Sequence, residues 1–189
     1  MEKLLPVGIS NRHIHLSQKD LETLFGTGYT LTHFKDLSQP GQYASEEKVD
    51  VVGPKGALNG VRILGPVRDI TQIEISVTDG FVLGVKAPIK DSGQIEGSPG
   101  IKVVGPKGQV DLDKGVIIAA RHIHMSPEDA ESFHVKDKDV VNVLTEGKRG
   151  VLFQNVLVRV NKDYHLEMHV DIEEGNAAGL KNGDMVKIV

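Results

Sequence analysis

The sequence predicts a mainly β protein made of two similar small β-barrel domains with short capping α-helices. Two observations lead to this fold class. The phrase RHIHLS at residues 12–17 returns as RHIHMS at residues 121–126, and short runs of Val, Ile and Leu between Gly and Pro fill much of the chain. A near-identical phrase in both halves indicates a duplicated unit, and short apolar runs bounded by turn residues are typical of strands.

Each copy of the phrase predicts the same local structure. Residues 7–16 and 116–125 read as continuous strands that carry the histidines. Ser17 and Ser126 follow as helix N-caps, each with an aspartate three residues later, and Pro127 occupies the first helical position of the second copy. Strand, histidine pair and capped helix therefore form one reused unit.

The rest of the chain reads mostly as strands. The predicted strands are KVDVV, GVRILG, QIEISV, FVLGVKA and GIKVV in the middle, and residues 140–144, 151–160 and 165–171 near the end, before a short helix at 173–178 and a final strand. The Gly/Ser/Pro-rich stretch 91–100 is the best candidate for a boundary. It predicts a first barrel over residues 1–95 and a second over 96–189, and this division leaves an exchange of strands between the barrels open.

Composition excludes several classes of function. The chain of 189 residues carries a net charge of −4, has 4% aromatic residues and contains no cysteine. Nucleic acid and anionic membranes are therefore not expected as partners, and neither a disulfide nor a cysteine nucleophile is available. The N-terminal MEKLLPVGIS holds no long apolar segment, so no signal peptide or membrane span is expected and the predicted location is the cytoplasm.

The histidine pairs point to metal binding. Residues i and i+2 of a strand share one face, so His13 lies beside His15, and His122 beside His124. Two adjacent imidazoles suit a divalent ion such as zinc. One such pair could arise by chance, but its repetition makes chance a poor explanation.

Third ligands can be sought on neighbouring strands. Glu74 lies on the polar face of ITQIEISV, where a lone carboxylate is ordinarily just exposed. In HLEMHVD, the polar face carries His165, Glu167, His169 and Asp171, and any of these four could complete the second site. A solvated face is the simplest reading of His165 and Glu167. Three protein ligands and one open position are the pattern of catalytic zinc.

Arginines offer a phosphate site. Arg68, in LGPVRD, can bind two phosphate oxygens through its planar guanidinium, although a lone arginine before a strand is more often a surface residue. Arg12 and Arg121 flank the histidine pairs but are expected on the opposite strand face. From the residues alone, a two-metal hydrolase of a thioester, ester or amide ranks first. A non-enzymatic, metal-binding barrel protein is the alternative.

The chain also resembles a known family, the PduL-type phosphate acyltransferases or phosphotransacylases. The segments that carry the resemblance are PVGISNRHIHLS, QPGQYASEEKV, GPVR, QIEIS, RHIHMSPEDA and the strand of His169. The resemblance implies two β-barrels, two zinc ions per chain between them, and transfer of a propanoyl or acetyl group between coenzyme A and inorganic phosphate. It assigns one zinc ion to His13, His15 and Glu74, the other to His122, His124 and His169, and phosphate to Arg68.

The resemblance also bears on partners. Acyl-CoA and phosphate are the expected substrates, and a homo-oligomer is compatible with the family. Members packaged into bacterial microcompartments often carry an amphipathic extension before the first barrel, whereas here six residues precede Val7. A free enzyme of the bacterial cytoplasm is therefore expected, and microcompartment association through a partner stays compatible. Hydrolysis at the two metals remains the alternative function.

Overall fold

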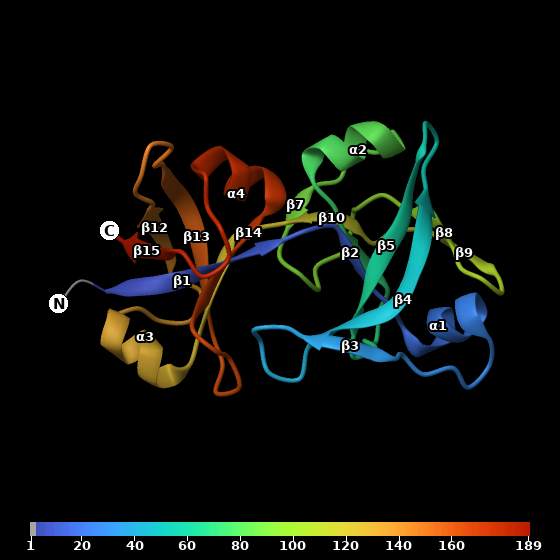
Figure 1. Ribbon diagram of the computed structural model, residues 1–189, viewed down its shortest axis with the longest axis horizontal. Coiled ribbons are helices and arrows are strands. Elements are labelled where there is room, and N and C mark those ends of the chain that lie inside the picture. The colour runs from blue at the N-terminus through green and yellow to red at the C-terminus, as the bar shows by residue number, and fades with distance from the viewer. Residues whose placement is uncertain (1–2) are drawn as a thin grey trace. The chain divides into compact units, whose positions relative to one another are not determined.

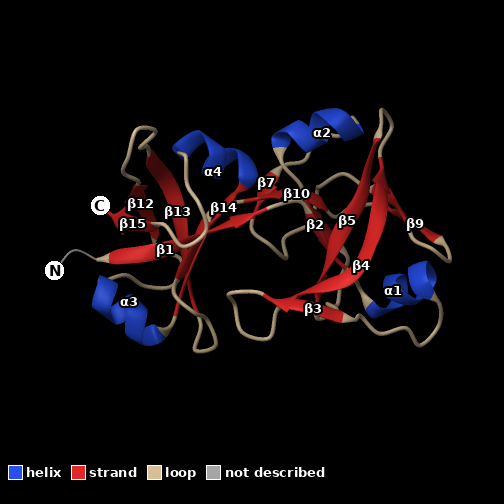
Figure 2. Ribbon diagram, viewed as in Figure 1, coloured by secondary structure: helices blue, strands red, loops and turns tan. Residues whose placement is uncertain are grey.

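The computed structural model describes residues 3–189 and is mainly β (Figure 2), which confirms the predicted fold class. Strands account for 42% of the chain and helices for 16%. The strands form a closed six-stranded barrel and a curled sheet, and the described residues hold four short helices. The fold class expected from short Val/Ile/Leu runs and capped helices is therefore the one that the chain adopts.

The described chain divides into two compact units, which are treated separately below. The barrel unit comprises the described residues up to Asn11 together with residues 38–40 and 120–189. The sheet unit comprises residues 12–37 and 41–119. Both units are discontinuous in sequence, and the boundary predicted near residue 95 falls inside the sheet unit.

The barrel unit is a closed barrel. Its strand order is β1 (Leu4–Ser10), β14 (Glu167–Asp171), β11 (His122–Met125), β13 (Leu152–Val160), β12 (Val140–Leu144) and β15 (Met185–Ile188), with β15 pairing back to β1. Ile123, Met125, Val158 and Met168 are fully buried inside it. The helices α3 (Pro127–Phe133) and α4 (Ile172–Ala178) lie outside the strands (Figure 1).

The sheet unit is a curled sheet. Its order is β7 (Ile89–Lys90), β10 (Val116–Ala119), β6 (Gln72–Glu74), β2 (His13–His15), β5 (Ala57–Gly65), β4 (Tyr43–Val52), β8 (Ile101–Val104) and β9 (Gln109–Leu112), and β3 (His33–Asp36) pairs with β4. Its core includes the fully buried Ile14, Leu16, Ile63 and Ile73. Helices α1 (Gln18–Phe25) and α2 (Val77–Leu83) flank the strands (Figure 1).

Both units place their histidine pair on the same strand pattern. The strand β2 runs parallel to β5 and antiparallel to β6, and β11 runs parallel to β13 and antiparallel to β14. The strand that precedes each pair belongs to the other unit, because β1 pairs with β14 and β10 pairs with β6. The continuous strands predicted at 7–16 and 116–125 are therefore wrong, since each breaks just before its pair.

Helix formation accounts for one further difference between the predicted and the observed elements. Ser17 and Ser126 cap α1 and α3 as predicted, each accepting a hydrogen bond from a backbone N–H three residues later. The strand predicted for FVLGVKA is wrong, because its first three residues belong to helix α2. Ser76 and Asp79 form a capping box that starts this helix, and Gly84, with a positive φ, ends it.

Candidate active site

The first histidine pair lies on β2 within the sheet unit. His13 and His15 are 7% and 3% exposed, because β2 lies between β5 and β6 in the sheet. Glu74 on β6 faces His13 directly in the antiparallel register. Within residues 3–189, these three side chains are the group whose possible ligand atoms all lie within 4.8 Å of one another. Two imidazoles and a carboxylate at that spacing can hold a divalent ion.

The two oxygens of Glu74 have different surroundings. Oε2 lies 3.4 Å from Nε2 of His13. Oε1 accepts hydrogen bonds from Nε2 of Gln72 at 2.7 Å and from Oγ of Ser92 at 3.0 Å. Burial alone would raise the pKa of Glu74, but the neighbouring His13 and the hydrogen bond from Ser92 hold it below its usual range. The carboxylate is thus charged and oriented, with one oxygen turned toward the histidines.

His15 carries an unsatisfied nitrogen. Burial, assisted by the charges of His13 and Arg68, lowers its pKa to about 3, so the ring is neutral at physiological pH. The backbone carbonyl of Leu64 accepts a hydrogen bond from this ring, whereas Nδ1 is buried and has no hydrogen-bond partner among the described residues. A neutral, buried imidazole with a bare nitrogen is costly unless a ligand uses it.

Arg68 is brought to this same group. Its backbone N–H donates to the carbonyl of Leu16 at 2.9 Å, which anchors it beside the strand of the histidines. Its Nη1 donates to Oγ of Ser92 at 3.2 Å, and Ser92 in turn donates to Glu74. Arg68 therefore supplies a positive charge next to the three candidate ligands, although it lies six positions before Glu74 in the chain.

The second pair gathers three imidazoles within the barrel unit. The ring centroids of His122, His124 and His169 lie 4.7 to 5.1 Å apart. His169 on β14 faces His122 on β11 in the antiparallel register. In the sheet unit, Glu74 faces His13 in the same way. The two units thus present their predicted third ligands at equivalent positions.

The ring nitrogens of His122, His124 and His169 are less closely gathered than the ligand atoms of His13, His15 and Glu74. The rings of His122 and His169 stack with an interplanar angle of 4°. Nδ1 of His122 lies 2.8 Å from the carbonyl oxygen of Ala120, which places its proton there and the lone pair on Nε2. His124 resembles His15, because its Nδ1 is buried without a partner among the described residues and burial lowers its pKa to about 2.

Comparison with known proteins bears on this arrangement. Residues 6–181 match the phosphate propanoyltransferase family. This chain belongs to that family. Over 184 residues it is 61% identical to a phosphate propanoyltransferase of Thermotoga maritima, covering 97% of this chain and 88% of the relative. It is 51% identical to one from Clostridioides difficile over 188 residues, covering 100% of this chain and 90% of the relative, and 52% identical to one from Salmonella typhimurium over 182 residues, covering 96% and 86%.

Two residues around the first candidate site of this phosphate propanoyltransferase family member escaped the sequence reasoning, and a third, Glu167 near the second, was named only as one of four alternatives. Gln72 and Ser92 orient Glu74, and the N–H of Gly93 donates to Gln72 at 2.7 Å, so the segment after β7 supports the first site. Glu167, expected on a solvated face, has a side chain only 14% exposed and lies with Oε2 3.0 Å from Nε2 of His169, outside hydrogen-bond geometry. Local patterning could not single them out, because their partners are distant in sequence.

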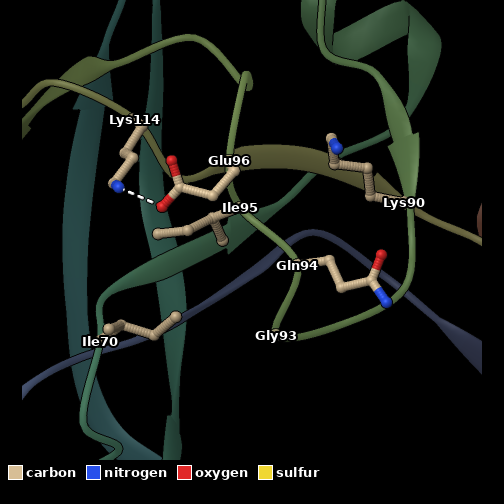
Figure 3. Close-up of a pocket in the computed structure, with 7 residues that line it drawn as sticks. All are labelled: Ile70, Lys90, Gly93, Gln94, Ile95, Glu96 and Lys114. Carbon is tan, nitrogen blue, oxygen red and sulfur yellow. Dashed lines mark hydrogen bonds and ion pairs between the residues drawn. The ribbon is translucent and has the colours of Figure 1, made fainter.

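A pocket of about 470 Å³ lies elsewhere in the sheet unit (Figure 3). Its lining residues are Ile70, Lys90, Gly93, Gln94, Ile95, Glu96 and Lys114, and Lys114 pairs with Glu96 across it. None of the predicted ligands lines this pocket. The candidate ligands therefore lie on and beside the histidine strands and not in this pocket.

In the described part of the chain, no helix combines the length and the apolar character that a membrane span requires.

Proposed function

We propose that this chain is a phosphate acyltransferase that moves a short acyl group, propanoyl or acetyl, between coenzyme A and inorganic phosphate at a site with two zinc ions. One observation carries the proposal. In a chain of this family, each histidine pair faces one further donor in the same register, Glu74 opposite His13 and His169 opposite His122. Arg68 stands beside the first group.

The residues present fit a metal ion. His13, His15 and Glu74 would hold one ion, and His122, His124 and His169 the other. The buried, bare Nδ1 atoms of His15 and His124 support this assignment, since both rings are neutral and these two nitrogen atoms lack another partner among the described residues. When bound, a zinc ion supplies Lewis acidity that polarises a thioester carbonyl and stabilises negative charge on the departing sulfur.

The chain's own residues would position the second substrate. The guanidinium of Arg68 can bind two oxygens of inorganic phosphate and direct a third toward the acyl carbon. A phosphate oxygen then bonds to that carbon, the carbon–sulfur bond breaks, and its electron pair leaves with the sulfur of coenzyme A. Because the chain contains no cysteine, no acyl-cysteine intermediate forms, and direct attack by phosphate accounts for the transfer.

An assay of free-thiol release tests the proposal. Purified protein should release thiol from propanoyl-CoA or acetyl-CoA when phosphate is present and should form one acyl phosphate for each thiol. Dependence on phosphate is the deciding measurement, because a two-metal hydrolase would release thiol equally well without it. Thiol release that ignores phosphate would therefore replace transfer by hydrolysis. Complete absence of turnover would favour a non-enzymatic metal-binding barrel protein.

Metal analysis tests the ligand assignment separately. Elemental analysis should find two divalent ions per chain in the wild-type protein. His13→Ala and His122→Ala should each lose about one ion and most activity, because each removes one of three protein ligands. Full metal content in both variants would refute the assignment of the ions to the histidine pairs, whatever the outcome of the thiol assay.

A further inference from the structure

Each histidine pair is preceded by an arginine that makes an ion pair within its own unit. In the sheet unit, Nη2 of Arg12 lies 3.1 Å from Oδ1 of Asp79, whose side chain is only 4% exposed. Asp79 is the third residue of helix α2, and its other oxygen, Oδ2, accepts a hydrogen bond from the backbone N–H of the N-cap Ser76. Ser76 follows Glu74 by two positions. Arg12 therefore links the start of the histidine strand to the segment that carries Glu74.

The barrel unit repeats this link with different residues. Nη1 of Arg121 lies 2.6 Å from Oε1 of Glu174, the third residue of helix α4. The other oxygen, Oε2, accepts a hydrogen bond from the backbone N–H of the N-cap Asp171, which follows His169 by two positions. Arg121 also donates through Nε and Nη2 to the carbonyl of Gln154 on β13, at 2.8 and 2.5 Å.

The two ion pairs join equivalent parts of the two units. In both, an arginine directly before the histidine pair binds one oxygen of the acidic residue that completes a helix capping box. In both, the N-cap of that helix lies two positions after the predicted third ligand. The helices differ in sequence, and the acidic residue changes from aspartate to glutamate, yet the link is kept. A link retained in both halves of a duplicated fold points to a function at the element that both halves share, the ligand group.

We propose that Arg12 and Arg121 are positioning residues for the two metal sites, each joining the histidine strand to the segment of the third ligand. The inference rests on the proposed metal sites and extends them beyond their ligands. Groups outside the ligand set that fix the geometry of a metal site typically contribute 10- to 100-fold to metal affinity. Each guanidinium is engaged with an acidic residue of its own unit.

Metal affinity, measured by competition with a chelator, tests the proposal without relying on turnover. Arg12→Met and Arg121→Met should each weaken one of the two ions by about 10- to 100-fold and leave the other unchanged. Arg121→Met should have the larger effect, because Arg121 uses three nitrogens and Arg12 is 42% exposed. Adding Arg12→Met to His13→Ala should cause no further loss of metal, since both changes act on the same site.

Lysine variants separate positioning from general stability. Arg12→Lys should restore most of the affinity, because an ammonium group can keep the ion pair that Nη2 of Arg12 makes with Asp79. Arg121→Lys should restore it only in part, since a lysine cannot reach both Glu174 and the carbonyl of Gln154 with a planar fork. Circular dichroism and thermal unfolding of each variant establish that it is folded.

A matched control is Arg149→Met. Arg149 also contacts helix α4, but its Nε donates to the carbonyl of Ala177 near the other end of that helix, at 2.9 Å. This variant should bind both ions with wild-type affinity. Wild-type affinity in Arg12→Met and Arg121→Met, or an equal loss in Arg149→Met, would overturn the positioning role. Wild-type protein that binds no metal would instead overturn the metal sites of the proposed function together with this inference.

Discussion

Replacing Arg68 by alanine should remove most of the phosphate-dependent turnover and leave the metal content unchanged. The side chain reaches the first ligand group through Ser92, but it is not one of the three candidate ligands. Its backbone N–H is held by Leu16, so the variant keeps the main-chain position and loses only the guanidinium. The experiment therefore isolates the contribution of that charged group to phosphate binding.

The expected magnitude follows from the kind of contact that is lost. A charge-assisted hydrogen bond to phosphate in a partly buried site contributes about 2–4 kcal/mol. This corresponds to a loss of roughly 30- to 1000-fold in rate. Arg68→Lys should fall between alanine and wild type, because an ammonium group keeps the charge but cannot bind two oxygens in one plane. If the contact forms mainly in the transition state, kcat should fall more than KM for phosphate rises.

Initial rates of thiol release over a range of phosphate concentrations measure kcat and KM, and elemental analysis measures the metal. Lys102→Ala is a suitable control in the same unit, because this variant also loses one positive charge. The ion pair that it removes is a long one, 3.7 Å between Nζ of Lys102 and Oδ1 of Asp111. It should behave as wild type. Near-normal phosphate-dependent turnover in Arg68→Ala would refute the reasoning and transfer the phosphate role to another residue. Loss of metal in that variant would make Arg68 a structural part of the site.

Three further predictions concern the metal sites and their supports. Dialysis against a chelator should abolish phosphate-dependent thiol release, and added zinc should restore it. In metal-free protein, the free energy of unfolding should fall as pH drops from about 6.5 toward 3, by up to about 1.4 kcal/mol per pH unit for each of His15 and His124. The unfolded chain takes up protons in that range, whereas the native pKa values are about 3 and 2. In urea titrations, His124→Gln should lose the His124 share of this pH dependence and keep the His15 share, and an undiminished dependence would contradict the assignment to His124. Gln72→Leu should reduce stability by about 1–3 kcal/mol and weaken metal binding, because it leaves the N–H of Gly93 unpaired and releases Glu74.

Local sequence signals predicted the repeated unit because they act over a few residues. Alternation within HIH fixes which side chains share a face, and Ser17 and Ser126 cap the following helices through bonds to residues three positions away. The mainly β class follows from the same kind of signal. These interactions need no knowledge of how distant strands pair.

Long-range pairing explains what the sequence reasoning missed. The breaks before each histidine pair arise because β1 and β2 pair with different sets of strands, which local alternation cannot reveal. The capping box of Ser76 and Asp79 was visible in the sequence, but the apolar run that follows it favoured a strand prediction. The Gly/Ser/Pro-rich stretch read as a boundary contributes Ser92, whose hydroxyl donates to a carboxylate 18 positions earlier.

The shared register also shows how the two proposed sites differ in chemistry. Each first histidine faces its third donor across an antiparallel pair, but the donor is a carboxylate in the sheet unit and an imidazole in the barrel unit. Three neutral imidazoles alone would leave the full charge of a divalent ion uncompensated.

Glu167 supplies a carboxylate to the second group, because it faces His124 in the same register and lies beside His169. Burial opposes its ionisation, but the adjacent His169 and the hydrogen bond from Ser38 hold its pKa below the usual range, so the group keeps its negative charge. A Cβ at position 8 would come within 2.9 Å of that carboxylate, which gives Gly8 a reason to be glycine and makes the barrel around Glu167 part of the site's electrostatics.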